Sequence, residues 1–224
     1  MGTRTPKDGS DAGPRRVLGL VLCGGASQRM GSDKALAELG GQRLIDYAVQ
    51  AQAPVADEVR LATGSAPRYP EIGLACVLDA EVSDGSGGPL AGLVAGLEAA
   101  RADGFEVLLV GACDTPRVTP ELYAALLAHR DASDHDLTLL GTHKGGRLHP
   151  EPLIGAYHVR ALEPARDALR ARRLKLTAFH AGLSVGLLDE HDFATPEPAR
   201  NLNTPLDLEA EEVVLRARRE GASA

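Results

Sequence analysis

Short apolar runs alternate along the chain with amphipathic segments, and the first apolar run is unbroken. Residues 17–23 form this run, whose length and content of Val and Leu are typical of a strand buried on both faces. A second run of the same kind spans residues 106–112. Further strands are expected at residues 58–63, 75–78, 136–141, 152–157 and 184–188.

Segments with helical character lie between these strands. Thr119 is suited to an N-cap and Pro120 to the first position of a helix over residues 121–130. Other helices are expected at residues 44–53, 90–102, 158–173 and 206–219, and helix-forming residues also begin at Ala35. This alternation predicts a single Rossmann-like α/β domain with a mainly parallel sheet and helices on both faces. In such sheets, ligands bind beyond the carboxyl ends of the strands.

A polar, glycine-containing loop follows the first strand. Gly24 and Gly25 allow backbone N–H groups to approach phosphate oxygens, and Arg29 and Lys34 supply compensating charge. Neither the P-loop spacing nor the dinucleotide spacing of glycines is present. An ordinary turn with solvated charges is the alternative, but the combination favours polyphosphate binding. We expect this loop to be exposed and the charge of Lys34 to meet only ligand.

Two aspartates stand where predicted strands end. Asp79 follows the strand at residues 75–78, and Asp114 follows the buried strand at residues 106–112. Asp114 could hold Mg²⁺, which takes one or two carboxylates together with phosphate oxygens. It could equally open a turn before Pro116, and the spacing alone does not decide between these roles. Because the glycine loop and both aspartates follow strand ends, they are expected to converge on one site.

The composition limits the possible partners. The 224 residues carry a formal net charge of −7, which argues against a general nucleic-acid or anionic-membrane surface. Binding of a triphosphate by such an acidic chain requires a local basic pocket and a divalent cation, Mg²⁺ or Mn²⁺. Aromatic residues make up only 3% of the chain, so the core is expected to be aliphatic. Cys23, Cys76 and Cys113 have no zinc-like spacing and are expected to be buried thiols in a reducing cytoplasm.

The N-terminal region allows two interpretations. Residues 1–14 are rich in Gly, Pro and charge, which predicts a disordered tail before a domain over residues 15–220. Arg15 and Arg16, followed by the apolar run, resemble a signal peptide, and residues 20–23 resemble a lipoprotein cleavage box. The apolar run is at the lower limit of length for the apolar core of a signal peptide, and Leu22 stands where the cleavage site requires a small residue. A cytoplasmic location is therefore favoured, with no membrane association.

The motifs resemble those of one enzyme family. L-C-G-G-A-S-Q-R-M-G-S-D-K, at residues 22–34, resembles the L-A-G-G-x-S-x-R-M-G-x-D-K signature of MobA-type molybdenum cofactor guanylyltransferases, within the nucleotidyltransferase superfamily. Cys23 replaces the usual alanine by another small residue. Further matches follow in the family's order: G-P-L-A-G at 88–92, C-D-T-P at 113–116, H-P at 149–150 and N-L-N-T-P at 201–205. None of the motifs after residues 22–34 is specific to the family by itself, whereas the complete set in this order is.

The resemblance implies the fold of nucleotide-diphospho-sugar transferases and the transfer of GMP from GTP to molybdopterin, with release of pyrophosphate. It implies that Arg29 and Lys34 stabilise the triphosphate and that Asp114 holds the catalytic metal ion, so these three are the expected catalytic residues. It places His149 near the acceptor. Molybdoenzymes or their chaperones are implied protein partners. The expected nucleotide- and cofactor-binding residues are Leu22, Cys23, Gly24, Gly25, Lys34, Asp79, Gly88, Asp114, Asn201 and Asn203.

Two other functions remain open at this point. A molybdopterin cytidylyltransferase or a sugar-phosphate nucleotidyltransferase would use the same motifs with another base or acceptor. A nucleotide-binding regulator without turnover is the second alternative, although intact Lys34 and Asp114 argue against it. The backbone around Leu22 and residues 88–92 are the candidates for contacts to guanine. The C-D-T-P segment favours the guanylyl branch by resemblance.

Overall fold

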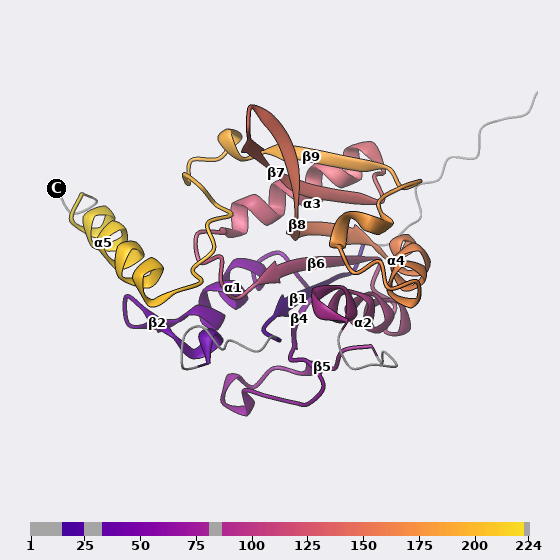
Figure 1. Ribbon diagram of the computed structural model, residues 1–224, viewed down its shortest axis with the longest axis horizontal. Coiled ribbons are helices and arrows are strands. Elements are labelled where there is room, and N and C mark those ends of the chain that lie inside the picture. The colour runs from indigo at the N-terminus through magenta and orange to yellow at the C-terminus, as the bar shows by residue number, and fades with distance from the viewer. Residues whose placement is uncertain (1–14, 25–32, 81–86, 222–224) are drawn as a thin grey trace, which may run out of the picture.

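The computed structural model describes residues 15–24, 33–80 and 87–221, and Figure 1 shows their arrangement. The predicted tail at residues 1–14, and Gly25 and Arg29 of the glycine loop, lie outside the described residues.

A seven-stranded sheet with the order β5-β4-β1-β6-β8-β7-β9 forms the centre of the domain. Strand β8 runs antiparallel to both of its neighbours, whereas every other pairing in this sheet is parallel. The prediction of a mainly parallel sheet is thus confirmed. The strands are β1 (Val17–Leu22), β4 (Glu58–Ala62), β5 (Cys76–Val77), β6 (Val107–Ala112), β7 (Leu137–Lys144), β8 (Arg147–His158) and β9 (Val185–Asp189).

Helices cover both faces of the sheet, as predicted (Figure 1). Helices α2 and α4 pack with one buried apolar cluster, and α1 and α3 contribute to the clusters on the opposite face. Thr119 caps α3 by accepting a hydrogen bond from the Leu122 N–H, which confirms its predicted role. None of the helices in the described ranges is long and apolar enough to cross a membrane. The helices are α1 (Leu44–Gln52), α2 (Gly88–Ala102), α3 (Pro120–Ser133), α4 (Leu162–Arg170) and α5 (Pro205–Gly221), with 3-10 turns η1 (Lys34–Leu36), η2 (Pro70–Ile72), η3 (Val159–Ala161), η4 (Leu176–Phe179) and η5 (Glu190–Asp192).

Strand β1 lies inside the sheet because both of its faces are apolar. Leu18 and Leu20 pack against the α2 and α4 layer, and Val21 packs against α1. Glycines in α2 let that helix approach closely: a Cβ at Gly96 would lie 2.4 Å from Cδ2 of Leu20. The first apolar run is therefore a core strand, and its last residues are held at the edge of the sheet where β6 also ends.

The segment after the glycine loop differs from the prediction. No α-helix begins at Ala35; a single 3-10 turn, η1, is followed by a small hairpin of β2 (Glu38–Leu39) and β3 (Gln42–Arg43). Gly40 and Gly41, with φ of 59° and 81°, make the tight turn between these strands. The chain therefore reverses at Gly40 and Gly41, where the residues before them predicted that a helix would continue.

The strands predicted at residues 136–141 and 152–157 are longer in the structure and form an antiparallel hairpin, β7–β8, because Gly145 and Gly146 adopt φ of 59° and 74° and reverse the chain only there. Strand β8 therefore includes Arg147 and His149, which lie before the predicted strand. The predicted helix at 158–173 is also shorter: β8 extends to residue 158, η3 follows, and α4 ends at Arg170.

Candidate functional site

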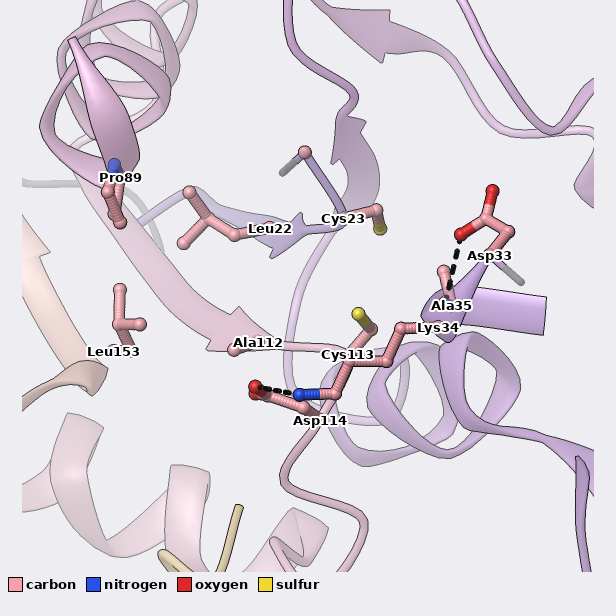
Figure 2. Close-up of a pocket in the computed structure, with 11 residues that line it drawn as sticks. Leu22, Cys23, Asp33, Lys34, Ala35, Pro89, Ala112, Cys113, Asp114 and Leu153 are labelled. Carbon is pink, nitrogen blue, oxygen red and sulfur yellow. Dashed lines mark hydrogen bonds and ion pairs between the residues drawn. The ribbon is translucent and has the colours of Figure 1, made fainter. Parts of the chain in front are cut away.

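A cavity of about 240 Å³ lies at the carboxyl ends of β1 and β6. Figure 2 shows side chains from β1, η1, β6 and α2 converging on it. The predicted convergence of the glycine loop with Asp79 and Asp114 is therefore confirmed for Gly24, Lys34 and Asp114, and not for Asp79. Its lining residues are Leu22, Cys23, Gly24, Asp33, Lys34, Ala35, Pro89, Ala112, Cys113, Asp114 and Leu153.

The register between β1 and β6 brings two cysteines together. Leu22 pairs with Ala112, so the next residues, Cys23 and Cys113, adjoin at the mouth of the cavity. Both thiols are free and buried, as predicted, whereas Cys76 is only half-buried. A hydrogen bond with Cys113, together with burial, raises the pKa of the Cys23 thiol. Cys23 therefore presents a neutral, compact thiol to a ligand.

Lys34 is the centre of the polar side of the cavity. Its Nζ donates to Oδ2 of Asp114 at 2.7 Å and to Oδ1 of Asn203 at 2.7 Å. Only 12% of the Lys34 side chain is exposed, so the expectation that its charge meets only ligand is wrong. The physical reason is local: Asp33 caps η1 by accepting from the Ala35 N–H, which places Lys34 in the first turn beside the strand ends.

Asp33 is itself fixed by two neighbours that the sequence did not single out. Arg68 forms an ion pair with its Oδ2, and the Tyr69 hydroxyl donates to its Oδ1 at 3.1 Å. An aspartate directly before a helix-like segment is a capping signal, so this residue could have been found from the sequence. Asp33 therefore orients the segment that carries Lys34.

Asp114 retains one oxygen for a further partner. Lys34 takes Oδ2, while Oδ1 is buried and has no hydrogen-bond partner among the described residues. Leaving such an acceptor unpaired is costly, so the position favours a ligand that can bind it. A carboxylate oxygen beside a phosphate site is a donor that Mg²⁺ prefers. The residues present therefore fit a divalent cation.

The predicted asparagine segment reaches the same place from the C-terminal part of the chain. Leu202 is fully buried beside Leu39 and Leu44, and its N–H donates to the Asp114 carbonyl at 2.9 Å. This anchor holds Asn203 against Lys34. Thr204 caps the following helix by accepting from the Asp207 N–H at 3.1 Å.

Four predicted site residues in the described ranges do not line this cavity, although one of them, Asn203, contacts Lys34 at its polar side. Asp79 follows β5 at the same edge of the sheet, beside Gly92, where a Cβ would lie 3.3 Å from its Oδ1. Burial raises the pKa of Asp79. Gly88 begins α2 with φ of 56°, and Pro89 lines the cavity in its place. Asn201 instead lines a second cavity.

The second cavity, of about 510 Å³, lies between the β7–β8 hairpin and the segment before α5. Its lining includes Thr142, Lys144, Glu151, Arg200 and Asn201. Burial raises the pKa of the Glu151 carboxyl, Lys144 opposes this shift, and the charge of Asp114 adds to it. Strand β8 contributes Leu153 to the first cavity and Glu151 to the second, so the two cavities are neighbours. His149, expected near an acceptor, lines neither of them and is exposed.

Comparison with known proteins identifies relatives over nearly the whole chain. A molybdenum cofactor guanylyltransferase of Cereibacter sphaeroides is 32% identical over 206 residues, covering 90% of this chain and 98% of the relative. A molybdenum cofactor guanylyltransferase of Rhodobacter capsulatus is 35% identical over 201 residues, covering 90% of this chain and 97% of the relative.

Solved structures share the fold at lower sequence identity. Molybdopterin-guanine dinucleotide biosynthesis protein A from Archaeoglobus fulgidus aligns with a TM-score of 0.69 and 22% identity, covering 89% of this chain and 99% of that one. The 2-C-methyl-D-erythritol 4-phosphate cytidylyltransferase of Thermus thermophilus aligns with a TM-score of 0.64 and 22% identity, covering 90% and 99%. These neighbours confirm the predicted nucleotidyltransferase fold. The model of one family, the MobA-like NTP transferase domain, matches residues 19–182, and the chain belongs to that family.

Proposed function

We propose that this protein transfers GMP from GTP to molybdopterin, forming molybdopterin guanine dinucleotide and releasing pyrophosphate. The observation that carries the proposal is the Lys34 ammonium held between Asp114 and Asn203 at the ends of β1 and β6. The printed names of the relatives, molybdenum cofactor guanylyltransferases, support the choice of base and acceptor.

The cavity offers separate surroundings for the base and for the phosphates. Leu22, Cys23 and Pro89 supply an apolar side beside which guanine can rest, with backbone groups available for hydrogen bonds. On the other side, Gly24 passes so close to the end of β4 that a Cβ there would lie 2.9 Å from the Gly64 nitrogen. A side chain does not fit at Gly24, and the phosphates can approach its backbone. Arg29 and Gly25 complete the proposed triphosphate site.

In the proposed reaction, an oxygen of the molybdopterin phosphate attacks the α-phosphorus of GTP. The bond from the α-phosphorus to the bridging oxygen breaks, and pyrophosphate leaves with that oxygen. Such chemistry depends on positioning and charge neutralisation. Lys34 has three N–H donors, of which two bind Asp114 and Asn203, so the third can bind a phosphate oxygen.

Asp114 would hold Mg²⁺, or Mn²⁺ in its place, through the oxygen that has no described partner. When bound, this ion supplies positive charge that neutralises the triphosphate. Lys34 fixes the other carboxylate oxygen and so sets the orientation of Asp114. The side chains of this site therefore hold the reacting groups in place, and none of them needs to become covalently attached to substrate.

We assign molybdopterin to the second cavity, because β8 contributes Leu153 to the nucleotide cavity and Glu151 to the second one. Lys144 and Arg200 supply positive charge there for the acceptor phosphate. The same proposal places the enzyme in the cytoplasm, in agreement with its three free cysteines, and makes molybdoenzymes or their chaperones the recipients of its product.

A competition experiment tests the base and the reaction together. The purified chain is incubated with molybdopterin, Mg²⁺ and an equimolar mixture of labelled GTP and CTP, and the dinucleotide products are separated by chromatography. Guanine product in large excess is expected, because a site that hydrogen-bonds one base leaves polar groups unpaired with another. Parallel reactions with ATP and UTP serve as controls.

Each other outcome has a defined meaning. Cytosine product in excess would assign the protein to the cytidylyl branch and leave the roles of Lys34 and Asp114 unchanged. Nucleotide binding without any dinucleotide or pyrophosphate would contradict the transferase and support the regulator.

A further inference from the structure

Three side chains with metal-binding groups meet at the outer edge of the sheet, in the part of the molecule opposite β5. They are His143, Asp189 and His191, and their ligand atoms all lie within 4.8 Å of one another. Nε2 of His143 lies 2.8 Å from Oδ2 of Asp189, and Nδ1 of His191 lies 3.2 Å from Oδ1 of the same carboxylate. The two imidazole rings are 4.5 Å apart between centroids.

The fold brings these residues together through the pairing of β7 with β9. Gly141 of β7 pairs with Asp189, the last residue of β9, and His143 lies two positions further on the same face of β7. Asp189 then caps η5 by accepting from the His191 N–H at 2.9 Å, which turns that imidazole back toward the strand. The backbone N–H of His143 donates to Glu190 at 2.7 Å and ties the two elements together.

We propose that His143, Asp189 and His191 form a site for a divalent transition-metal ion of the Zn²⁺ class. Two imidazoles and one carboxylate suit Zn²⁺, Co²⁺ or Ni²⁺, whereas Mg²⁺ prefers oxygen ligands. In a tetrahedral zinc site, ligand atoms are about 3.3 Å apart. The two imidazole nitrogens lie 2.8 and 3.2 Å from different oxygens of Asp189, so the carboxylate stands between them. All the ligand atoms lie within 4.8 Å of one another, within reach of one bound ion.

The site differs in chemistry and in position from the nucleotide site and does not depend on the proposed function. Asp114 offers an oxygen on the ends of the parallel strands, whereas the histidine cluster lies on β7, β9 and η5. The histidine cluster borders the second cavity, because His143 and Glu190 are part of the lining of that cavity. An ion bound there would join the end of the β7–β8 hairpin to the turn after β9, on one side of the cavity that also contains Asn201.

The experiment measures metal binding directly, with the full chain prepared without a histidine tag and treated with a chelator. Co²⁺ is titrated while visible absorption is recorded, and Zn²⁺ is then added as a competitor. One Co²⁺ per chain, displaced by Zn²⁺, is expected for this site. His143→Ala and His191→Ala should each raise the Kd at least about tenfold, and Asp189→Asn should do the same.

Two variants serve as matched controls. His149→Ala removes another exposed histidine of the same hairpin, and Asp114→Asn removes the carboxylate of the nucleotide site; both should retain the wild-type Kd. Circular dichroism checks that each variant folds, and His191→Gln provides a second, bulkier replacement. Wild-type protein that binds no Co²⁺ would overturn the proposal. So would histidine variants with unchanged affinity, or a near-ultraviolet band from thiolate ligation, which would place the ion at Cys23 and Cys113.

Discussion

The two halves of the central sheet are built differently and offer different chemistry. In the half formed by β5, β4, β1 and β6, all strands are parallel, so their carboxyl ends meet along one edge. Lys34 and Asp114 are gathered there beside a cavity whose other side is apolar. In the half formed by β8, β7 and β9, the antiparallel β8 creates a hairpin that carries His143 and Lys144.

The difference shows how a parallel sheet gathers the residues of the proposed phosphate site, which a hairpin alone would not. Parallel strands bring backbone and side chains from distant parts of the sequence to one place: the ion pair of Lys34 with Asp114 spans 80 residues. The hairpin instead adds a second wall, since β8 contributes Leu153 to the first cavity and Glu151 to the second. Strand β8 thus connects the nucleotide half with the half to which we assign the acceptor.

The largest expected effect comes from removing the carboxylate of the parallel half. Asp114→Asn keeps the size of the side chain but removes the charge that binds Lys34 and that we propose binds Mg²⁺, so kcat/KM for pyrophosphate release should fall at least about a hundredfold. Mn²⁺ should restore part of the activity, because it binds weakened sites better. Asp167→Asn, on the exposed face of α4, is the control. Identical Mg²⁺ activation curves for wild type and variant would show that Asp114 is not the metal ligand.

A loss of at least about tenfold in kcat/KM is expected for Lys34→Ala. The variant removes the charge facing the triphosphate and also leaves the Asp114 and Asn203 oxygens without their common donor. Circular dichroism should stay unchanged, since the variant keeps Ala35, the buried residue of η1, and Lys175→Ala provides an exposed lysine as control. Near-normal turnover in a folded Lys34→Ala protein would contradict the triphosphate assignment.

The parallel half was largely predictable from the sequence, and the reasons are physical. Strands buried on both faces must be apolar throughout, so β1 and β6 are visible as continuous runs. Capping residues such as Thr119 and Thr204 mark helix starts because few other side chains can bind the free N–H groups. Residues that directly follow such strands, Cys23 and Asp114 among them, could therefore be placed at the cavity.

The rest depends on tertiary contacts that leave little trace in the local pattern. Nothing near Leu153 indicates that β8 runs antiparallel between β6 and β7, so its place in the cavity was missed. The contact of Lys34 with Asn203 spans 169 residues, and the sequence suggested an exposed lysine instead. The histidine cluster was missed for the same reason, because His143 and Asp189 become neighbours only through the pairing of β7 with β9.

A smaller effect is expected where the two halves meet. Asn203→Ala removes one acceptor of the Lys34 ammonium but keeps the contact of Leu202 with the Asp114 carbonyl. We expect kcat with GTP to fall about fivefold, the effect of losing one partly exposed charged hydrogen bond.

Asn201→Ala should instead raise the KM for molybdopterin and leave the KM for GTP unchanged, since Asn201 lines the second cavity. Equal effects of both variants on both KM values would remove the distinction between a nucleotide cavity and an acceptor cavity.

The smallest expected effect concerns stability and belongs to Asp79 in the parallel half. Burial raises the pKa of this carboxyl above its value in the unfolded chain, so the folded state binds the proton more tightly. Proton binding to Asp79 therefore stabilises the fold fully at pH values below the unfolded pKa of about 3.9. This stabilisation is lost as the pH rises through the folded pKa. Asp79→Asn cannot ionise and should therefore unfold at a slightly higher urea concentration than wild type at pH 7. The difference should shrink as the pH is lowered toward about 4. A variant that is less stable than wild type at pH 7 would show that the Asp79 carboxylate is stabilised by contacts that outweigh its burial.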